Sequence, residues 1–313
     1  MENIQVRYVS IDDSQAGQRL DNFLFTELKS IPKSRVYRML RSGEVRVNKR
    51  RAKQTYRLLE GDNIRIPPVR VPSDPNEKRP LFVSEALAEN LKAAIILETD
   101  DLLVINKPAG LAVHGGSGIT LGLIEAMRVL RPECRRMELV HRLDRDTSGC
   151  LMIAKNRKTL VDLHQQLQNK TLSKRYLALV FGRWPKSLRR VDAPLQKNEL
   201  SSGERMVKVS QDGKASSTLF KVLEWFDGVS LVEASPVTGR THQIRVHAAF
   251  KGHAIAGDAK YAADAANKEA RQRGLQRLFL HASELRLTVA GEPLTVKAEL
   301  DDSLKMFLDK IRK

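Results

Sequence analysis

Residues 141–149 read HRLDRDTSG and precede, after Cys150, the apolar segment LMIA at 151–154. Two carboxylates and two guanidinium groups therefore lie beside a segment that predicts a buried strand. Ionised side chains are costly to desolvate, so four of them rarely stand next to a core unless they pair with one another or meet a charged ligand. A functional site at the start of a core strand is one interpretation, and a solvated turn with a local ion pair is the alternative.

Length and charge limit what such a site binds. The chain has 313 residues, 42% of them hydrophobic, which is enough for two domains with cores of their own. Its net charge of +17 favours a polyanionic partner, either nucleic acid or an anionic membrane surface. A membrane is the weaker alternative, because no apolar run approaches the roughly 20 residues of a spanning helix and the N-terminus lacks a signal-peptide pattern. Two cysteines, Cys134 and Cys150, are too few for a disulfide framework, and a reducing cytoplasm is expected.

Positive charge is concentrated in residues 31–60, which contain ten basic and two acidic residues. Because this many cations repel one another without a counter-charge, phosphate binding is favoured over a merely solvated surface. Three of them recur at every third residue of a predicted helix and are expected to share one face. The residues expected to bind phosphate are Lys33, Arg35, Arg38, Arg41, Arg46, Lys49, Arg50 and Arg51.

Hydrophobic spacing predicts the elements around this charge. Apolar residues at helical spacing predict one helix over 20–28 and a second over 32–43, which begins at a proline and ends at a glycine. Alternating valines and isoleucines then predict a small ribbon of strands at 45–47 and 64–66. A Pro-rich, charged stretch follows, and it predicts a linker at residues 69–92.

Beyond the linker, short apolar segments bounded by turns predict strands, and leucines at helical spacing predict one helix, 159–169. The strands are too closely spaced for many parallel crossovers. We therefore expect an α+β fold, in which helices pack on a mixed, largely antiparallel sheet. The predicted strands are 95–97, 102–105, 151–154, 177–181, 205–209, 218–224, 231–234, 278–280 and 294–298.

Four segments near the N-terminus carry a resemblance. GQRLDNFL at 17–24, PKS at 32–34, SGEVRVN at 42–48 and GD at 61–62 resemble the S4-type RNA-binding module. The resemblance implies a small α/β module over residues 15–68, preceded by an N-terminal strand or extension at 1–14.

Four further blocks resemble the pseudouridine synthases that act on large-subunit ribosomal RNA. They are INKPAG at 105–110, the 141–149 stretch, KRYLA at 174–178 and TGRTHQIRVH at 238–247, in the order the family has them. The resemblance implies a catalytic domain over residues 93–313. It also implies that specific uridines of 23S ribosomal RNA are isomerised, at several sites, by base flipping followed by aspartate-dependent cleavage of the glycosidic bond and its re-formation at C5.

The implied partner is 23S ribosomal RNA or an assembling large ribosomal subunit, which the protein would bind as a monomer in the cytoplasm. Neither a membrane nor a cofactor is expected. The reaction needs a group that labilises the glycosidic bond, and the resemblance assigns this role to Asp144. An ionised carboxylate can attack C1′ or C6 of the nucleotide or remove a ribose proton, and the sequence leaves these routes open.

Two further catalytic residues follow from the resemblance. Arg245 would keep the carboxylate ionised, although a strand with Arg245 pointing outward fits the alternation of the segment equally well. Tyr176 would stack on the target uracil with its hydroxyl near the proton transfers, although a tyrosine that opens a strand is more often a half-buried strand residue.

The residues expected to bind substrate lie in the same blocks. Arg142 would fill the space left by the flipped base, and Ile244 would pack on the uracil. Arg240 is expected to contact substrate, and His141 is expected at the site as a structural donor that holds the loop. Asp146 is interpreted as a structural carboxylate within the turn.

Two other functions remain open. Residues 144–147 also match the Asp-x-Asp-x-Thr signature of magnesium-dependent phosphatases of the haloacid-dehalogenase type, in which the first carboxylate forms a phosphoenzyme. A non-enzymatic ribosome-assembly factor would use the N-terminal module only to hold RNA. A metal site is not expected from the scattered histidines, since His242 and His247 would fall on opposite faces of a predicted strand.

Overall fold

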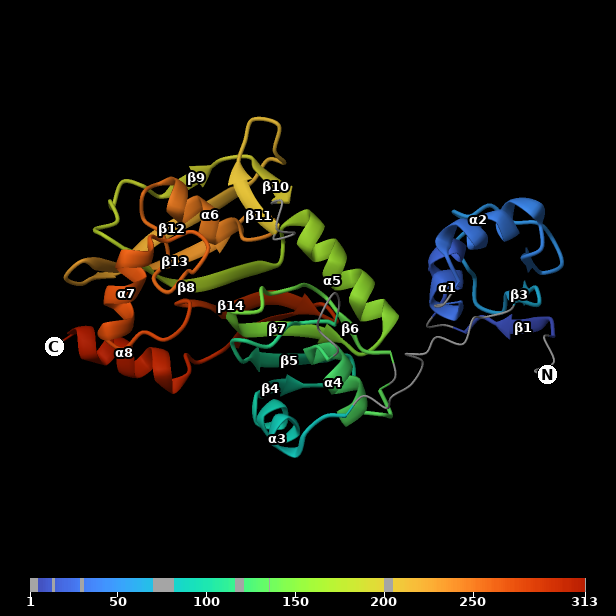
Figure 1. Cartoon of the computed structure of the whole chain (residues 1–313). Coiled ribbons are helices and arrows are strands. Elements are labelled where there is room, and N and C mark those ends of the chain that lie inside the picture. Colours follow the sequence, from blue (N-terminus) through green and yellow to red (C-terminus); the bar gives the residue numbers. More distant parts are fainter. Residues whose placement is uncertain are drawn as a thin grey trace. The chain divides into compact units, whose positions relative to one another are not determined.

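The structure is a computed structural model of the chain, and it describes residues 5–12, 15–28, 31–69, 82–115, 121–134, 136–199 and 205–312. The chain folds into two compact units, Met1–Phe82 and Val83–Lys313. Figure 1 shows both units. Each has a hydrophobic core of its own.

The N-terminal unit contains the helices and the ribbon that the apolar spacing predicts. Helices α1 (Leu20–Glu27) and α2 (Lys33–Ser42) pack against a sheet of β1 (Arg7–Ser10), β3 (Asn63–Ile66) and β2 (Arg46–Val47), in that order. All its strand pairs are antiparallel. Strand β1 lies within the predicted extension and forms an edge of this sheet. The core of the unit includes Leu20, Phe23, Leu24, Val36, Met39, Leu40, Ile64 and Ile66.

The predicted linker is too long at its C-terminal end. Residues 70–81 lie outside the described residues, but Glu85–Ala93 form helix α3, which begins at an N-cap where the Ser84 side chain accepts a hydrogen bond from the Leu87 amide. Leu87 and Leu91 are spaced at i and i+4, and Leu91 is fully buried in the core of the C-terminal unit. This unit therefore begins at Val83, before the predicted start at residue 93.

The C-terminal unit is built on the predicted mixed sheet. Neighbouring strands pair antiparallel except β7 and β14, the parallel pair among the described residues. Its main path is β4 (Ile95–Glu98), β5 (Leu102–Lys107), β7 (Ser148–Ala154), β14 (Leu280–Val289), β8 (Ser173–Phe181), β13 (Val229–Pro236), β12 (Ser217–Trp225) and β9 (Arg190–Asp192). Strand β15 (Glu292–Lys297) pairs with β14, and β6 (Glu138–Leu139) pairs with β7; β10 (Leu195–Glu199) and β11 (Arg205–Val209) form a separate ribbon.

Strand β14 joins the two halves of this sheet. In Figure 1 it lies between β7 and β8, so a strand near the C-terminus separates two strands from the middle of the chain. Gly149 lets β7 approach β14 closely. Its φ is +106°, and a Cβ at this position would lie 2.3 Å from the Ala282 carbonyl oxygen. The glycine that ends the 141–149 stretch is thus required by the sheet.

Helices cover the sheet, and one of them corrects a prediction. The segment interpreted as a strand around His242 and His247 is helix α6 (Gln243–Phe250). Its residues 243–248 are all buried, so no amphipathic period marks the segment as helical. Helix α5 (Arg157–Asn169) is the one that leucine spacing predicts. The helices α4 (Leu123–Leu130), α7 (Asp264–Gln272) and α8 (Asp302–Arg312) were not predicted from the sequence.

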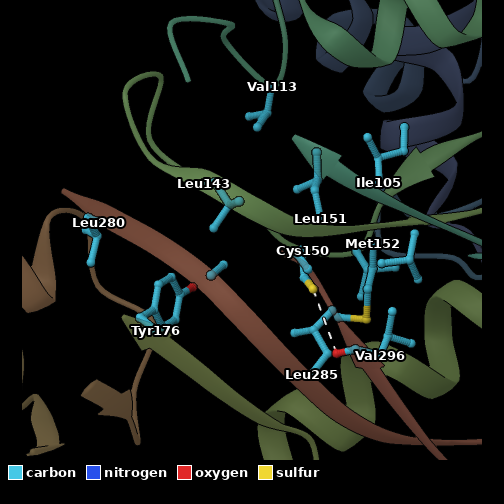
Figure 2. Close-up of a cluster of buried hydrophobic side chains, with 14 of the residues drawn as sticks. Ile105, Val113, Leu143, Cys150, Leu151, Met152, Tyr176, Leu280, Leu285 and Val296 are labelled. Carbon is cyan, nitrogen blue, oxygen red and sulfur yellow. Dashed lines mark hydrogen bonds between the residues drawn. The ribbon is translucent and has the colours of Figure 1, made fainter. Parts of the chain in front are cut away.

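The large core of this unit reaches the 141–149 stretch. Figure 2 shows Tyr176 beside Leu143 and Leu280, at one end of a cluster that continues through Leu151 and Met152. Both cysteines are free. Within the described residues, none of the helices has the length and apolar character needed to cross a membrane.

Candidate active site

A cavity of about 480 Å³ lies where four segments of the C-terminal unit meet. These are the loop before β7, the start of β8, the segment between β13 and α6, and the first turn of α6. The cavity gathers every catalytic and substrate-binding residue predicted for this unit, although the sequence separates them widely. These residues are His141, Arg142, Asp144, Tyr176, Arg240, Ile244 and Arg245.

A buried lysine holds the loop that carries Asp144. Lys107, at the end of β5, is fully buried and its Nζ donates hydrogen bonds to the carbonyl oxygens of Pro108 (2.7 Å), Leu111 (2.8 Å) and Arg145 (2.9 Å). The Gly110 amide donates to the same Arg145 carbonyl. Burial lowers the pKa of Lys107 to about 7, while the nearby carboxylate of Asp146 raises it. Lys107 thus fixes the backbone next to Asp144, a role that the sequence did not reveal.

The predicted pairing of Arg245 with Asp144 is present, but it is the weaker of two. Arg245 Nη1 lies 3.4 Å from Asp144 Oδ2, whereas its Nε and Nη2 donate to the two oxygens of buried Asp258, both at 2.7 Å. Burial lowers the pKa of Arg245, but hydrogen bonding and the charge of Asp258, with that of Asp144, raise it above its ordinary value. The guanidinium is therefore a permanent cation, anchored by Asp258 and presented to Asp144.

Asp258 is itself fixed by the backbone. Its Oδ1 accepts hydrogen bonds from the amides of Lys260 (2.9 Å) and Tyr261 (3.2 Å), and its side chain is fully buried. Asp258 was not predicted as a site residue, because a single carboxylate between α6 and α7 carries no pattern of its own. Only the fold brings it to the arginine.

Tyr176 and Ile244 form apolar parts of the cavity wall. Tyr176 lies on β8 and is buried, and burial together with the charge of Asp144 raises the pKa of its phenol well above the ordinary value. Its hydroxyl therefore stays protonated and is available as a donor. Ile244 lies in the first turn of α6, so the strand alternative for Arg245 is wrong.

The remaining predicted substrate contacts differ in how strongly they are held. Arg142 is exposed and, within the described part of the chain, makes no ion pair. Arg240 is exposed too, with its Nε 3.4 Å from the Ala215 carbonyl oxygen. His141 Nε2 accepts a hydrogen bond from the Met152 amide (3.1 Å), so the prediction of a structural donor is corrected to a structural acceptor. Burial, and next the charge of Lys174, lower the pKa of His141 to about 3 and keep the ring neutral.

Asp146 stays apart from Asp144. Its carboxylate pairs with Arg145 Nε at 3.0 Å, with both side chains largely exposed, and it does not line the cavity. The Asp-x-Asp-x-Thr phosphatase signature places both aspartates at one reaction site, so an Asp146 side chain outside the cavity disfavours that alternative. Among the residues that the structure describes, no group of three or more histidine, cysteine or acidic side chains is arranged to hold a metal ion.

His242 is a second residue of the site that was not predicted from the sequence. It is the N-cap of α6 and adopts a left-handed backbone conformation with φ of +52°. Its Nε2 lies 3.7 Å from Asp144 Oδ2, and its Nδ1 lies 2.8 Å from the Tyr261 hydroxyl. The strand interpretation concealed this residue, because it placed His242 in the middle of a regular element.

The predicted phosphate-binding residues of the N-terminal unit form an unpaired basic surface. None of the eight makes an ion pair within the described residues, and all except half-buried Arg35 are exposed. Arg41 and Arg51 line one hollow of about 440 Å³, and Arg46 and Lys49 line another of about 940 Å³. On α2, the three arginines predicted to share a face are interleaved with the buried Val36, Met39 and Leu40 and lie off that buried face.

Two family models match the chain. The model described as RNA pseudouridylate synthase matches residues 101–250, and the S4 domain model matches residues 18–64. The first range contains Asp144, Tyr176 and Arg245. The second contains all eight predicted phosphate-binding residues.

Relatives named ribosomal large subunit pseudouridine synthase C are similar along nearly the whole chain. The one from Escherichia coli (strain K12) is 52% identical over 315 residues, covering 99% of this chain and 98% of the relative. The one from Pasteurella multocida (strain Pm70) is 51% identical, covering 99% and 95%. Among solved structures, human RNA pseudouridylate synthase domain containing 4 is 27% identical with a TM-score of 0.60, covering 72% of this chain and 96% of that chain.

Proposed function

This chain belongs to the RNA pseudouridylate synthase family, and on this premise we propose that it isomerises uridines of 23S ribosomal RNA to pseudouridines. The observation that carries the proposal is the place of Asp144, in a cavity beside an anchored arginine, a buried tyrosine and an isoleucine. The relatives' names supply the class of RNA.

The reaction is a balanced rearrangement. The bond from ribose C1′ to uracil N1 breaks, the base rotates, and a bond from C1′ to C5 forms while C5 loses a proton and N1 gains one. Asp144 starts the reaction, by attack at C1′ or C6 or by removing a ribose proton. The side chains of His242 and Arg245 both approach Oδ2, so Oδ1 is the oxygen that acts: within the described residues no donor reaches it.

The other residues prepare the base. Uracil leaves its stack at a cost of a few kcal/mol, and the free guanidinium of Arg142 fills the space it leaves. Tyr176 and Ile244 hold the ring, with Arg240 and the loop fixed by His141 completing the wall. Arg245 keeps Asp144 ionised once RNA has excluded water from the cavity.

The basic surface of the N-terminal unit supplies affinity for RNA phosphates. Several uridines are modified, on free 23S RNA or on an assembling large subunit, by a monomer in the cytoplasm. The S4 domain match and the unpaired cations support this division of labour.

Tritium release tests the function directly. RNA transcribed from the large-subunit gene with uridine tritiated at C5 loses its label to water only when C5 is substituted. Purified protein should release the label, and Asp144→Asn should slow single-turnover release by at least about a thousandfold, as expected for loss of a nucleophile or base. Asp146→Asn is the matched control and should remain within about twofold, because its ion pair is exposed.

The same assay distinguishes the alternatives. Release that persists in EDTA excludes the magnesium-dependent phosphatase. An RNA complex without release, in the presence or absence of EDTA, would support the assembly factor and contradict the proposal.

A further inference from the structure

A chain of three hydrogen-bonding groups ends at the catalytic carboxylate. It runs from the Val207 amide on β11 to the Tyr261 hydroxyl (3.0 Å) and from there to His242 Nδ1 (2.8 Å). The other ring nitrogen, Nε2, faces Asp144 Oδ2 at 3.7 Å. The His242 side chain is 13% exposed, so the chain of contacts is largely shielded from water.

The chain of contacts favours one tautomer of His242. Tyr261 has a single hydroxyl proton, and its oxygen already accepts a hydrogen bond from the Val207 amide. Donation of the hydroxyl proton to Nδ1 is the arrangement that uses this proton, and it makes Nδ1 the acceptor of a neutral imidazole. The ring proton is then on Nε2 and points at Asp144.

The surroundings agree with a neutral ring. Burial is the largest influence and lowers the pKa of His242; the charges of Arg245 and Lys260 also lower it, while those of Asp144 and Asp258 raise it. Burial raises the pKa of Tyr261, which keeps the phenol protonated. A neutral ring with Nδ1 occupied and Nε2 protonated has no free lone pair, so it is a donor and not a base.

The local backbone is adapted to this arrangement. His242 takes a left-handed conformation that side chains other than glycine rarely adopt, and this conformation starts α6. Arg245 lies three residues further on, so one helix start presents two donors to the same oxygen, Asp144 Oδ2.

We propose that His242 and Tyr261 are positioning residues of the isomerisation: Tyr261 fixes the tautomer of His242, and the Nε2–H of His242, together with Arg245, holds Asp144 Oδ2 so that Oδ1 reacts. The inference rests on the proposed function. At 3.7 Å the contact is long in the free protein, and it shortens when RNA closes the cavity and removes competing water.

Three variants separate this role from a merely structural one. Asn tolerates the left-handed backbone but is too short to reach Asp144, so His242→Asn removes the donor and keeps the fold. His242→Gln restores an N–H donor at greater reach. Tyr261→Phe keeps the ring, over which the Arg245 guanidinium lies at 5.1 Å, and removes only the hydroxyl that fixes the tautomer.

Single-turnover tritium release from a saturating ribosomal RNA fragment is the test. His242→Asn should slow release about tenfold or more, since hydrogen bonds to charged groups have effects of this size. His242→Gln should recover part of the rate, and Tyr261→Phe should slow release about threefold to tenfold.

The other charged and titratable groups around Asp144, which are Arg245, Lys107 and Tyr176, remain unchanged in all three variants. His253→Asn is the control: His253 bonds the Phe181 carbonyl and contacts the Trp184 ring, outside the cavity, and its loss should leave the rate unchanged. Affinity for the fragment should stay within about twofold throughout, since the variants act after binding.

The outcomes are distinguishable. If wild-type protein releases no tritium, the proposed function fails. If wild type is active and His242→Asn matches it in rate, the inference fails while the function stands. If His242→Asn and His242→Gln are equally slow, His242 has only a structural role and the inference is again overturned.

Discussion

Arg245 divides its donors between two carboxylates, and the division explains how a buried cation can serve a reaction. Two of its nitrogens are held by Asp258 at 2.7 Å, so the guanidinium is oriented before RNA arrives. Its third nitrogen faces Asp144 at 3.4 Å and is not committed to a strong bond. Asp144 therefore gains a fixed positive neighbour and keeps its freedom to react.

Asp258→Asn tests this anchoring. The amide cannot accept two charge-assisted hydrogen bonds, so the guanidinium loses its orientation, and single-turnover tritium release should fall by about thirtyfold or more. Removing the charge of one partner of the buried ion pair should also lower the free energy of unfolding by roughly 3–5 kcal/mol. Activity is measured under conditions where the variant remains folded.

Asp301→Asn is its control. Asp301 also pairs with an arginine, Arg277, but it is more exposed and lies outside the cavity. Its loss should leave the rate within about twofold. Equal rates for wild type and Asp258→Asn would show that Arg245 needs no anchor.

His141 makes the stability of the C-terminal unit depend on pH. Burial lowers its pKa to about 3 in the folded chain, against an ordinary value of 6.5. Between these values the unfolded state binds more protons, so the free energy of unfolding falls as the pH falls. From about pH 7 to about pH 5 this single group should remove roughly 2 kcal/mol.

Urea unfolding of wild type and His141→Gln at both pH values measures this effect. Glutamine offers the Met152 amide an acceptor but does not titrate, so its pH-dependent loss should be smaller by the same roughly 2 kcal/mol. The two tryptophans of the chain, Trp184 and Trp225, lie in the C-terminal unit, so their fluorescence follows that unit alone. An identical loss in both proteins would exclude His141 as the cause.

The site residues differ in how readily they can be predicted from the sequence. Asp144, Tyr176 and Arg245 stand in blocks whose order points to the family, so the sequence alone named them as candidates, and the structure brings all three to one cavity. Asp258 and Tyr261 could not be predicted, because their roles arise only where the segment after α6 folds back under it. Lys107 stands in a block too, but nothing in a sequence shows that its ammonium meets three carbonyl oxygens.

At the scale of elements, hydrophobic periodicity predicted the helices that bury one face, and it failed for a helix that is buried on all sides. Helices α1, α2 and α5 bury a stripe and were predicted within a few residues. Helix α6 is buried all round, so its short Ile-Arg-Val run resembles strand alternation. Local pattern therefore could not identify the helix that brings Gln243, Ile244 and Arg245 to the cavity.

The contact of β7 with β14 makes a prediction for Gly149. In Gly149→Ala a Cβ would meet the Ala282 carbonyl at 2.3 Å, and the backbone φ of +106° would be strained as well. Since the clash is with backbone, the strands must separate, and the free energy of unfolding should fall by about 3 kcal/mol. Tryptophan fluorescence in a urea titration measures it.

Gly291→Ala is the matched control in the hairpin between β14 and β15. Its φ is +87°, but nothing lies within 4 Å of a Cβ there, so it should lose only the conformational part, about 1 kcal/mol. Equal losses in the two variants would mean that the approach of β7 to β14 is not tight.

At the scale of the whole molecule, charge is divided between the two units by function. The net charge of +17 arises from cations in both units: the eight on the N-terminal surface make no ion pair within the described residues, whereas some in the C-terminal unit are committed to carboxylates, as Arg245 and Arg277 are. Composition alone predicted a polyanionic partner. It could not show which cations are free, because pairing is decided by tertiary contacts.

Free cations displace counterions from RNA, and this gives the last prediction. Each phosphate contact contributes about 0.7–0.9 to the slope of the logarithm of affinity against the logarithm of salt concentration. Arg38→Gln with Arg41→Gln removes two exposed cations of α2, so the slope should flatten by about 1.5 and affinity at low salt should fall. Lys268→Gln with Arg271→Gln removes the same charge from exposed positions of α7, away from the cavity, and should leave the slope unchanged. Filter binding of a 23S RNA fragment between about 50 and 200 mM salt measures both. If the two pairs of substitutions flatten the slope equally, net charge alone governs binding and the N-terminal surface has no special part in it. If only the α2 pair flattens the slope, the affinity for RNA is localised on the N-terminal surface, while the chemistry is assigned to Asp144.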